Sequence, residues 1–262
     1  MKSLTEIWIY PIKSMKGIRK NEVELDSLGL IGDRRMMLVD DSGEFLSQRT
    51  IPQLALFEPI EQIEYFEVSF QGDKIDLTAA EGKTIDCQVW DQQATARLFG
   101  EQVNQFFSDH LKQKVRLVLL DEKQPIVLEK ENAGDGRSVG FVDGYPILTL
   151  SRASLAELNG RLDEPIGMDR FRPNLILEGC EAFEEDTWSS FQIGAIPFTG
   201  IKPCPRCVVT TINQSNLSKS KEPLKTLSQY RLVDHVVNFG AYVGHDALGT
   251  LREGDAVSIK EL

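Results

Sequence analysis

Two cysteines three residues apart carry the strongest chemical signal in the chain. They lie in Cys204-Pro205-Arg206-Cys207, with an arginine between them. Such a pair is half of a zinc site, a dithiol redox centre, or two separate thiols of which one reacts. A neighbouring cation favours the thiolate, which is the form that ligates a metal, and thiolates suit soft or redox-active metals. Cys207 is therefore a candidate metal ligand, and a thiol packed as a small hydrophobe is the alternative.

The rest of the sequence gives zinc and dithiol chemistry little support. A structural zinc site needs four ligands, but Cys87 and Cys180 stand alone and the three histidines show no ligand spacing. A thioredoxin-like dithiol normally opens a helix, whereas the β-branched residues 208–212 predict a strand after the pair. A single reactive thiol at Cys207 and a thiol packed as a small hydrophobe remain as the two interpretations.

Basic and hydrogen-bonding residues recur at the ends of predicted strands, far apart in the sequence. They are Lys13-Ser14, Arg34-Arg35, Arg49 and Arg170-Phe171-Arg172-Pro173-Asn174. Arginine forks and a serine hydroxyl are the groups that hold a phosphate through charge-assisted hydrogen bonds. Each of them taken singly is more often a solvated surface charge, so a site requires that the fold bring them together. Asp143 is interpreted as a turn residue in preference to a group that orients a ligand.

Composition and charge exclude several classes of protein. The formal net charge of −11 argues against nucleic-acid binding, which needs a basic face. The longest apolar runs, such as Tyr145–Leu150, are far shorter than the roughly 20 residues of a membrane-spanning helix. The first ten residues lack the pattern of a signal peptide, and four cysteines do not form a disulfide framework in 262 residues. We expect a cytoplasmic protein with no membrane contact.

Short segments with alternating polarity predict a largely β structure in the first half. The expected strands are 2–12, 20–25, 35–40, 63–70, 74–77, 84–89 and 115–120. Apolar side chains at helical spacing predict one helix over 100–111.

The second half begins near Phe141 and is expected to add strands at 147–150, 172–177, 188–193, 196–200, 208–212, 237–243 and 256–259. A helix over 155–162, capped by Ser151 or Ser154, and a helical turn over 223–230 complete it. Many short strands with few helices predict a mainly β or α+β fold. A boundary within 121–140 divides the chain into predicted domains 1–120 and 121–262.

An ordered set of motifs resembles the MOSC-domain proteins that carry an N-terminal MOSC β-barrel domain. This group includes the mitochondrial amidoxime-reducing component and the bacterial hydroxylaminopurine-resistance proteins. The matching segments are 9–14, 32–35, 141–146, 150–155, 170–174, 204–211, 221–227 and 238–242. Any one of them is weak, but together they cover nearly the whole chain in family order. The resemblance implies a MOSC β-barrel packed with an N-terminal β-rich domain.

The resemblance also implies a cofactor site. Cys207 is expected to be the protein ligand to molybdenum, and hence catalytic, in a molybdenum–molybdopterin cofactor. The residues expected to bind that cofactor are Lys13, Ser14, Arg34, Arg172, Asn174, Arg206 and Tyr242. Cys204 has no role carried over from the family.

The implied activity is reduction of small N-hydroxylated compounds by removal of oxygen from nitrogen. No cysteines have the spacing of an iron–sulfur cluster, so electrons are expected from a separate electron-transfer protein. The alternative is a module that binds the molybdenum cofactor or carries sulfur on Cys207 without turnover of its own. A third hypothesis, a non-catalytic β protein with structural cysteines, leaves the ordered motifs unexplained.

Overall fold

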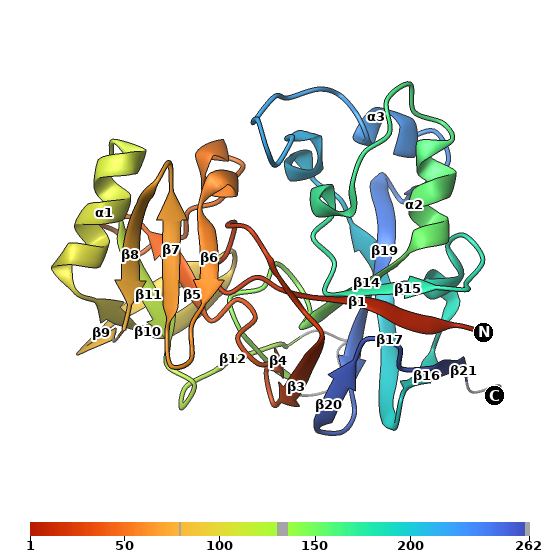
Figure 1. Cartoon of the computed structure of the whole chain (residues 1–262), viewed down its shortest axis with the longest axis horizontal. Helices are drawn as coiled ribbons and strands as arrows, with labels where there is room; N and C mark the ends of the chain where they lie inside the picture. Colours follow the sequence, from red (N-terminus) through yellow and green to blue (C-terminus); the bar gives the residue numbers. More distant parts are fainter. Residues whose placement is uncertain (79, 130–135, 260–262) are drawn as a thin grey trace.

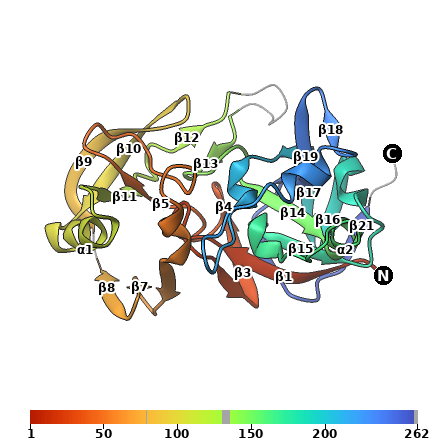
Figure 2. The same ribbon diagram turned by 90° about the horizontal axis from the view of Figure 1, so that it is seen from above.

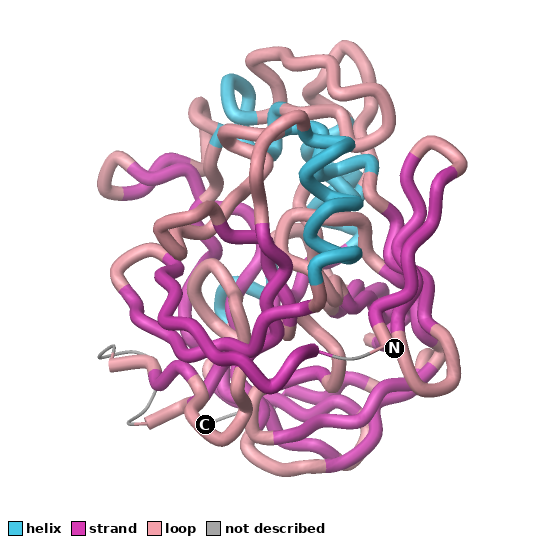
Figure 3. Tube along the Cα trace, turned by 90° about the vertical axis from the view of Figure 1, so that its left-hand side faces the viewer, coloured by secondary structure: helices cyan, strands magenta, loops and turns pink. Residues whose placement is uncertain are grey.

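Short β-strands dominate both halves of the molecule, which lie side by side (Figure 1). The computed structural model describes residues 1–78, 80–129 and 136–259. The predicted fold class, mainly β with few short helices, is confirmed. Helices occupy little of the trace in Figure 3, where strands and loops make up most of it.

The largest sheet forms the second half of the molecule. Its strands, in spatial order, are β2 (Ile18–Lys20), β1 (Ser3–Ile9), β15 (Leu175–Glu178), β14 (Ile147–Ser151), β19 (Val236–His245), β17 (Ile196–Pro205), β16 (Ser190–Ile193) and β21 (Val257–Ile259), with β18 (Leu232–Val233) paired to β19. Only β14 and β15 run parallel within this described sheet. The parallel pair needs a crossover, which α2 (Arg152–Asn159) begins.

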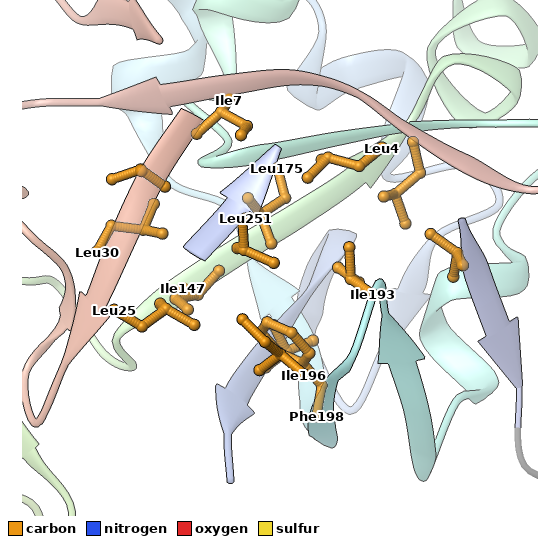
Figure 4. Packing of buried hydrophobic residues seen from close by; sticks show 14 of the residues in the cluster. Leu4, Ile7, Leu25, Leu30, Ile147, Leu175, Ile193, Ile196, Phe198 and Leu251 are labelled. Atoms are coloured by element: carbon orange, nitrogen blue, oxygen red, sulfur yellow. The ribbon is translucent and has the colours of Figure 1, made fainter. Parts of the chain in front are cut away.

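A small three-stranded sheet covers one face of the large one. Its strands are β20 (Gly249–Arg252), β3 (Glu22–Asp26) and β4 (Gly29–Leu30). The alternation in β3 buries Val23 and Leu25 and exposes the glutamates between them. These side chains pack against Leu4, Ile147 and Phe198 of the large sheet, and Figure 4 shows the labelled members of this core between the two layers. Burial of such side chains is the main force that holds the layers together.

The first half contains two further sheets and a helix. The sheets are β5 (Met36–Val39), β11 (Arg116–Leu120), β10 (Gln92–Phe99) and β9 (Ala80–Val89), and β6 (Glu58–Glu61), β7 (Phe66–Phe70) and β8 (Asp73–Leu77). The helix α1 (Glu101–Leu111) contacts β8 and β11 and lies at the outer end of this half (Figure 2). Its buried Asn104 donates to Phe99 O at 3.0 Å and accepts from Leu117 N at 2.8 Å, which ties the helix to its sheet. A β12 (Ile126–Val127) and β13 (Ser138–Val139) pair follows.

The remaining helical elements are short. The prediction of a cap for α2 is confirmed at Ser151, whose side chain accepts from Ser154 N, although the helix begins at Arg152 and ends at Asn159. The predicted helical turn near residue 223 contains α3 (Leu224–Leu227). Four 3₁₀ turns are described: η1 (Pro52–Leu56), η2 (Met168–Arg170), η3 (Glu184–Thr187) and η4 (Val208–Thr211).

The strand expected at 208–212 is wrong, because these residues form η4. The hydroxyls of Thr210 and Thr211 donate to the carbonyls of Cys207 and Val208 at 3.0 and 2.7 Å. Arg170 Nε donates to Thr210 O at 2.8 Å. These bonds satisfy the backbone locally and replace a strand ladder, despite the β preference of the residue types.

Two other strand predictions begin too early. The segment expected at 172–177 is a strand only from Leu175, since Arg172 has a positive φ of 55°. The segment expected at 63–70 is a strand only from Phe66.

Strand pairing crosses the predicted division at residue 120, which stays a prediction. β1 pairs with β15 in the sheet of the second half, and β3 pairs with β20 near the end of the described chain. Part of the boundary segment, residues 130–135, lies outside the described residues. The first 30 residues thus contribute strands to both sheets that enclose the core of the second half.

Candidate functional site

A cavity of about 410 Å³ lies where residues of the two halves meet. Among the residues that line it are all eight that the sequence nominated: Lys13, Ser14, Arg34, Arg172, Asn174, Arg206, Cys207 and Tyr242. The fold therefore brings together side chains that lie up to 229 positions apart in the chain (242 − 13). None of the eight lies away from the cavity.

Cys207 stands at the point where β17 ends and η4 begins. Its backbone is extended, with φ −118° and ψ 179°, and its side chain is half-buried. Its carbonyl accepts from Thr210 N at 3.1 Å, which holds the turn beneath the thiol. A thiol in this position faces the cavity and is accessible to a ligand there.

Cys204 differs from Cys207 in its surroundings. It is 1% exposed and does not line the cavity. It is hydrogen-bonded to the Tyr242 side chain, and burial raises the pKa of the Cys204 thiol. The two members of the Cys-x-x-Cys pair therefore have different environments. Cys204 is buried, whereas Cys207 lines the cavity.

Arg206 lies between the two cysteines and lines the cavity. Its Nε donates to Phe239 O at 2.8 Å and its Nη1 to Phe171 O at 3.1 Å. Its Nη2 is buried and has no hydrogen-bond partner within the described part of the chain. A buried donor of this kind is costly to leave unpaired, so Nη2 marks a place for an acceptor from a ligand.

Two further arginines stack around Tyr10. The Arg34 and Arg172 guanidinium carbons lie 4.4 and 4.2 Å from its ring centroid. Arg172 Nη1 donates to Met15 O at 2.6 Å. Burial raises the pKa of Tyr10 to about 12, against the attraction of the two arginines, so the ring stays neutral and acts as a spacer between two cations.

Asn174 joins three segments behind these arginines. It is 1% exposed. Its Oδ1 accepts from Arg34 Nη1 at 3.0 Å and from Leu148 N at 3.1 Å, and its Nδ2 donates to Trp8 O at 3.0 Å. Asn174 therefore orients Arg34 while it ties β1, β14 and the start of β15 together.

Lys13 and Asp143 form an ion pair at the cavity wall. Lys13 is 4% exposed, and its Nζ donates to Asp143 Oδ1 at 2.6 Å and to Phe141 O at 3.0 Å. Gly140 permits the neighbouring backbone to approach Arg34, since a Cβ at Gly140 would lie 2.7 Å from Arg34 O. Asp143 is thus a ligand-facing carboxylate, a role that the sequence ranked below a simple turn.

The electrostatic character of the cavity is opposite to that of the whole chain. Seven of the described lining residues are basic and Asp143 is their only acidic neighbour: Lys13, Arg34, Arg49, Arg170, Arg172, Lys202 and Arg206. The chain as a whole carries −11. A concentration of cations in a cleft with low-dielectric walls favours an anion that carries several charges.

Backbone strain is concentrated at the same place. Ser14, Arg34, Trp90 and Arg172 have positive φ values of 70°, 48°, 58° and 55°, and they are four of the ten described non-glycine residues of this kind. Each lines the cavity. Such conformations cost energy and persist where surrounding contacts impose them, commonly at functional sites.

Comparisons with known proteins match nearly the whole chain. A model described as the MOSC N-terminal beta barrel domain matches residues 1–114, and one described as the MOSC domain matches residues 136–258. Mitochondrial amidoxime reducing component 2 from Rattus norvegicus is 36% identical over 97% of this chain and 82% of its own length. The Bos taurus protein of that name is 33% identical over the same shares. The chain belongs to the MOSC family of the amidoxime-reducing components.

A third relative of this MOSC protein is component 1 from Xenopus laevis, 30% identical over 97% of this chain and 81% of its own. Among solved structures, the YUAD protein from Bacillus subtilis matches with a TM-score of 0.43 and 10% identity over 99% of this chain and 98% of that one. That structural likeness is too low to carry an argument.

The MOSC site contains no protein-built metal centre within the described residues, since no group of three or more His, Cys, Asp or Glu side chains is placed to hold an ion. The zinc interpretation of the cysteine pair therefore has no structural support. In the same described ranges, no helix has the length and apolar character to cross a membrane.

Sequence reasoning missed two residues of the MOSC cavity and one aromatic ring behind it. Gln48 and Trp90 line the cavity, whereas Tyr10 packs against Arg34 and Arg172, and Arg49 was noted only as a basic residue. Gln48 and Gln214 exchange reciprocal amide hydrogen bonds of 2.9 and 3.0 Å, which join the two walls. The one available signal was the placement of Tyr10 beside Pro11 in the first matching motif.

Proposed function

We propose that this protein is a molybdenum-cofactor-dependent oxidoreductase that reduces N-hydroxylated compounds, with Cys207 as the protein ligand to the metal. The observation that carries the proposal is the placement of a half-exposed Cys207 thiol in a cavity lined by cations from both halves. The family membership and the names of the relatives support the substrate class.

The residues present fit such a cofactor. The phosphate and dithiolene of molybdopterin are anionic, which matches the seven basic side chains, and the unpaired Arg206 Nη2 offers a buried donor to that anion. Lys13, Ser14, Arg34, Arg172 and Arg206 would hold its phosphate and ring. Asn174 acts through Arg34, and Tyr242 also lines the cavity. When bound, the cofactor supplies the two-electron chemistry by which oxygen is removed from nitrogen.

The chain's own groups determine how the reaction is contained. A hydroxylamine-type substrate, two electrons and two protons yield the amine and water. The Cys207 thiolate anchors the cofactor, and the cations hold it in one orientation. The hydrogen bonds of Asn174 and the Gln48–Gln214 amide pair hold the two sides of the cavity together. The substrate therefore enters a preformed cavity.

Electrons come, in this proposal, from a separate electron-transfer protein. Three of the four cysteines, Cys87, Cys180 and Cys204, do not line the cavity, and none is grouped for a metal cluster in the described chain. A cytoplasmic location stays a prediction from the sequence. A cofactor-binding or sulfur-carrier module without turnover is the alternative function.

The test uses protein produced in a host that makes the molybdenum cofactor. Bound molybdenum near one equivalent and reduction of benzamidoxime to benzamidine with a chemical reductant are expected for the natural chain. Cys207→Ser should lose both. Cys180→Ser is the matched control, because that thiol is also half-buried but lies outside the cavity.

Two outcomes would contradict the proposal or redirect it. Full activity of Cys207→Ser would exclude Cys207 as the metal ligand. One equivalent of bound molybdenum with no turnover of any N-hydroxylated compound would favour the carrier function.

A further inference from the structure

Trp90 is a cavity residue that the proposed function does not use. It stands at the turn between β9 and β10, with a φ of 58°, a conformation that is unusual for a bulky side chain. The hairpin belongs to the first half of the molecule, yet its tip lines the cavity beside Asp143 of the second half. A strained aromatic residue at a hairpin tip calls for contacts that impose it.

Two contacts immobilise the Trp90 ring, and a third holds its backbone. The Arg49 guanidinium carbon lies 4.0 Å from its centroid. Phe45 packs against it edge-on, with centroids 4.5 Å apart and planes at 61°. The carbonyl of Trp90 accepts from Gln88 Nε2 at 2.7 Å. The indole is thereby fixed in direction as well as in place.

The fixed indole donates its only hydrogen-bonding proton to Asp143. Trp90 Nε1 lies 3.1 Å from Asp143 Oδ1, the same oxygen that accepts from Lys13 at 2.6 Å. Asp143 Oδ2 has no hydrogen-bond partner among the described residues, and the side chain of Asp143 is 63% exposed to the cavity. Two donors thus occupy one oxygen and leave the other open.

That open oxygen is a charged acceptor. Partial removal from solvent inside the cavity raises the pKa of Asp143, but attraction to Lys13, Arg34 and Arg49 outweighs this effect and holds the pKa well below its usual range. An ionised carboxylate accepts hydrogen bonds and donates none. Within a wall of donors, Oδ2 is therefore the feature that recognises an N–H or O–H group.

We propose that Trp90 is a positioning residue that holds Asp143 so that Oδ2 accepts a hydrogen bond from the N–H or O–H group of the substrate. This inference rests on the proposed function and narrows its substrate class. Amidoximes and hydroxylamines carry such protons and would be favoured. Tertiary amine N-oxides carry an N–O bond but no such proton, and they would be disfavoured.

The decisive variant is Trp90→Phe in the molybdenum-loaded protein. Phenylalanine keeps an aromatic ring for Arg49 and Phe45 but removes the N–H donor. We expect kcat/KM for benzamidoxime to fall by roughly 10-fold, within the range of a lost charge-assisted hydrogen bond. The value of kcat/KM for N,N-dimethylaniline N-oxide should not change. The substrate ratio, which is kcat/KM for benzamidoxime divided by kcat/KM for the N-oxide, therefore falls. A merely structural role would lower both rates together.

Trp8→Phe is the matched control. Trp8 Nε1 also donates to a carboxylate, Glu6 Oε2 at 2.8 Å, but this pair does not line the cavity. Its substrate ratio should equal that of the natural protein. Asp143→Asn, which keeps the shape of the side chain and removes its charge, should lower the substrate ratio at least as much as Trp90→Phe. It also serves as the second variant if Trp90→Phe is unstable.

Binding of benzamidine, measured by calorimetry, separates this inference from the proposed function. Benzamidine presents N–H groups and needs no turnover, and its affinity should fall roughly 10-fold in Trp90→Phe. If the natural protein reduces benzamidoxime but Trp90→Phe matches Trp8→Phe in both assays, the inference is overturned. If no turnover occurs but benzamidine binding depends on Trp90, the inference stands and the proposed reaction fails.

Discussion

The two walls of the cavity are built in different ways. In the second half, Asn174, Arg206 and Tyr242 lie on or beside strands of one sheet, and the polar atoms of Asn174 and Arg206 bind backbone carbonyls and amides. In the first half, Arg49 lies in a turn and Trp90 in the turn of a hairpin, and their side chains contact one another. The cavity wall from the second half continues the folded core. The wall from the first half consists of turns that extend toward it.

This difference separates two kinds of function in one site. Side chains that also satisfy the sheet backbone cannot change without a cost in folding, which suits the constant task of holding a cofactor. Side chains on turns are free to vary with little effect on the core, which suits the choice of substrate. Changes in the sheet wall should therefore lower stability, and changes in the turn wall should leave it intact.

The largest effect on folding is expected from Asn174→Ala. This substitution removes the acceptor of Arg34 and Leu148 N and the donor to Trp8 O in a residue that is 1% exposed. The free energy of unfolding should fall by about 3 kcal/mol, measured by chemical denaturation.

The control for Asn174→Ala is Asn216→Ala, in an exposed loop where one local bond to Ser218 N is lost. That loss should cost less than about 1 kcal/mol. Equal denaturation midpoints for the Asn174 variant and the natural protein would remove the distinction between the walls.

A smaller effect is expected where the walls are tied together. Gln48→Ala breaks the reciprocal amide pair with Gln214 and the bond to Ser14 O at 2.7 Å. A loss of roughly 1–2 kcal/mol in the free energy of unfolding follows from the unpaired Gln214 amide. The turn-wall variant Arg49→Ala provides the contrast and should unfold within about 0.5 kcal/mol of the natural protein.

The smallest effect concerns reactivity alone and requires no substitution. Burial raises the pKa of Cys204, so at pH 8 less of it is thiolate than for an ordinary thiol, and its reaction with iodoacetamide should appear only as the pH rises further. Cys207 is half-buried at the cavity and should be alkylated first in cofactor-free protein. Mass spectrometry of the modified peptides measures both, and faster modification of Cys204 would contradict the structure of the pair.

Several features could be predicted because they depend on residues close in sequence. The alternation in β3, the helical spacing of α1 and the Ser151 cap are each decided within about one turn of helix or one strand. The candidate residues also share a recognisable chemistry, with one thiol, a serine and a set of guanidinium groups that suit a phosphorylated cofactor. Residue types and local order therefore predicted the fold class, and the ordered motifs that resemble the MOSC family nominated the eight side chains.

Only the tertiary structure decided how those side chains meet. Thr210 and Thr211 form a turn because Arg170, 40 residues away, holds the Thr210 carbonyl. Trp90 donates to Asp143 although 53 residues separate them in the sequence. One oxygen of that carboxylate stays open because two donors from the first half share the other. Such contacts depend on strand register and on which layers pack together. The hydrophobic burial that decides them is summed over the whole chain and has no local sequence pattern.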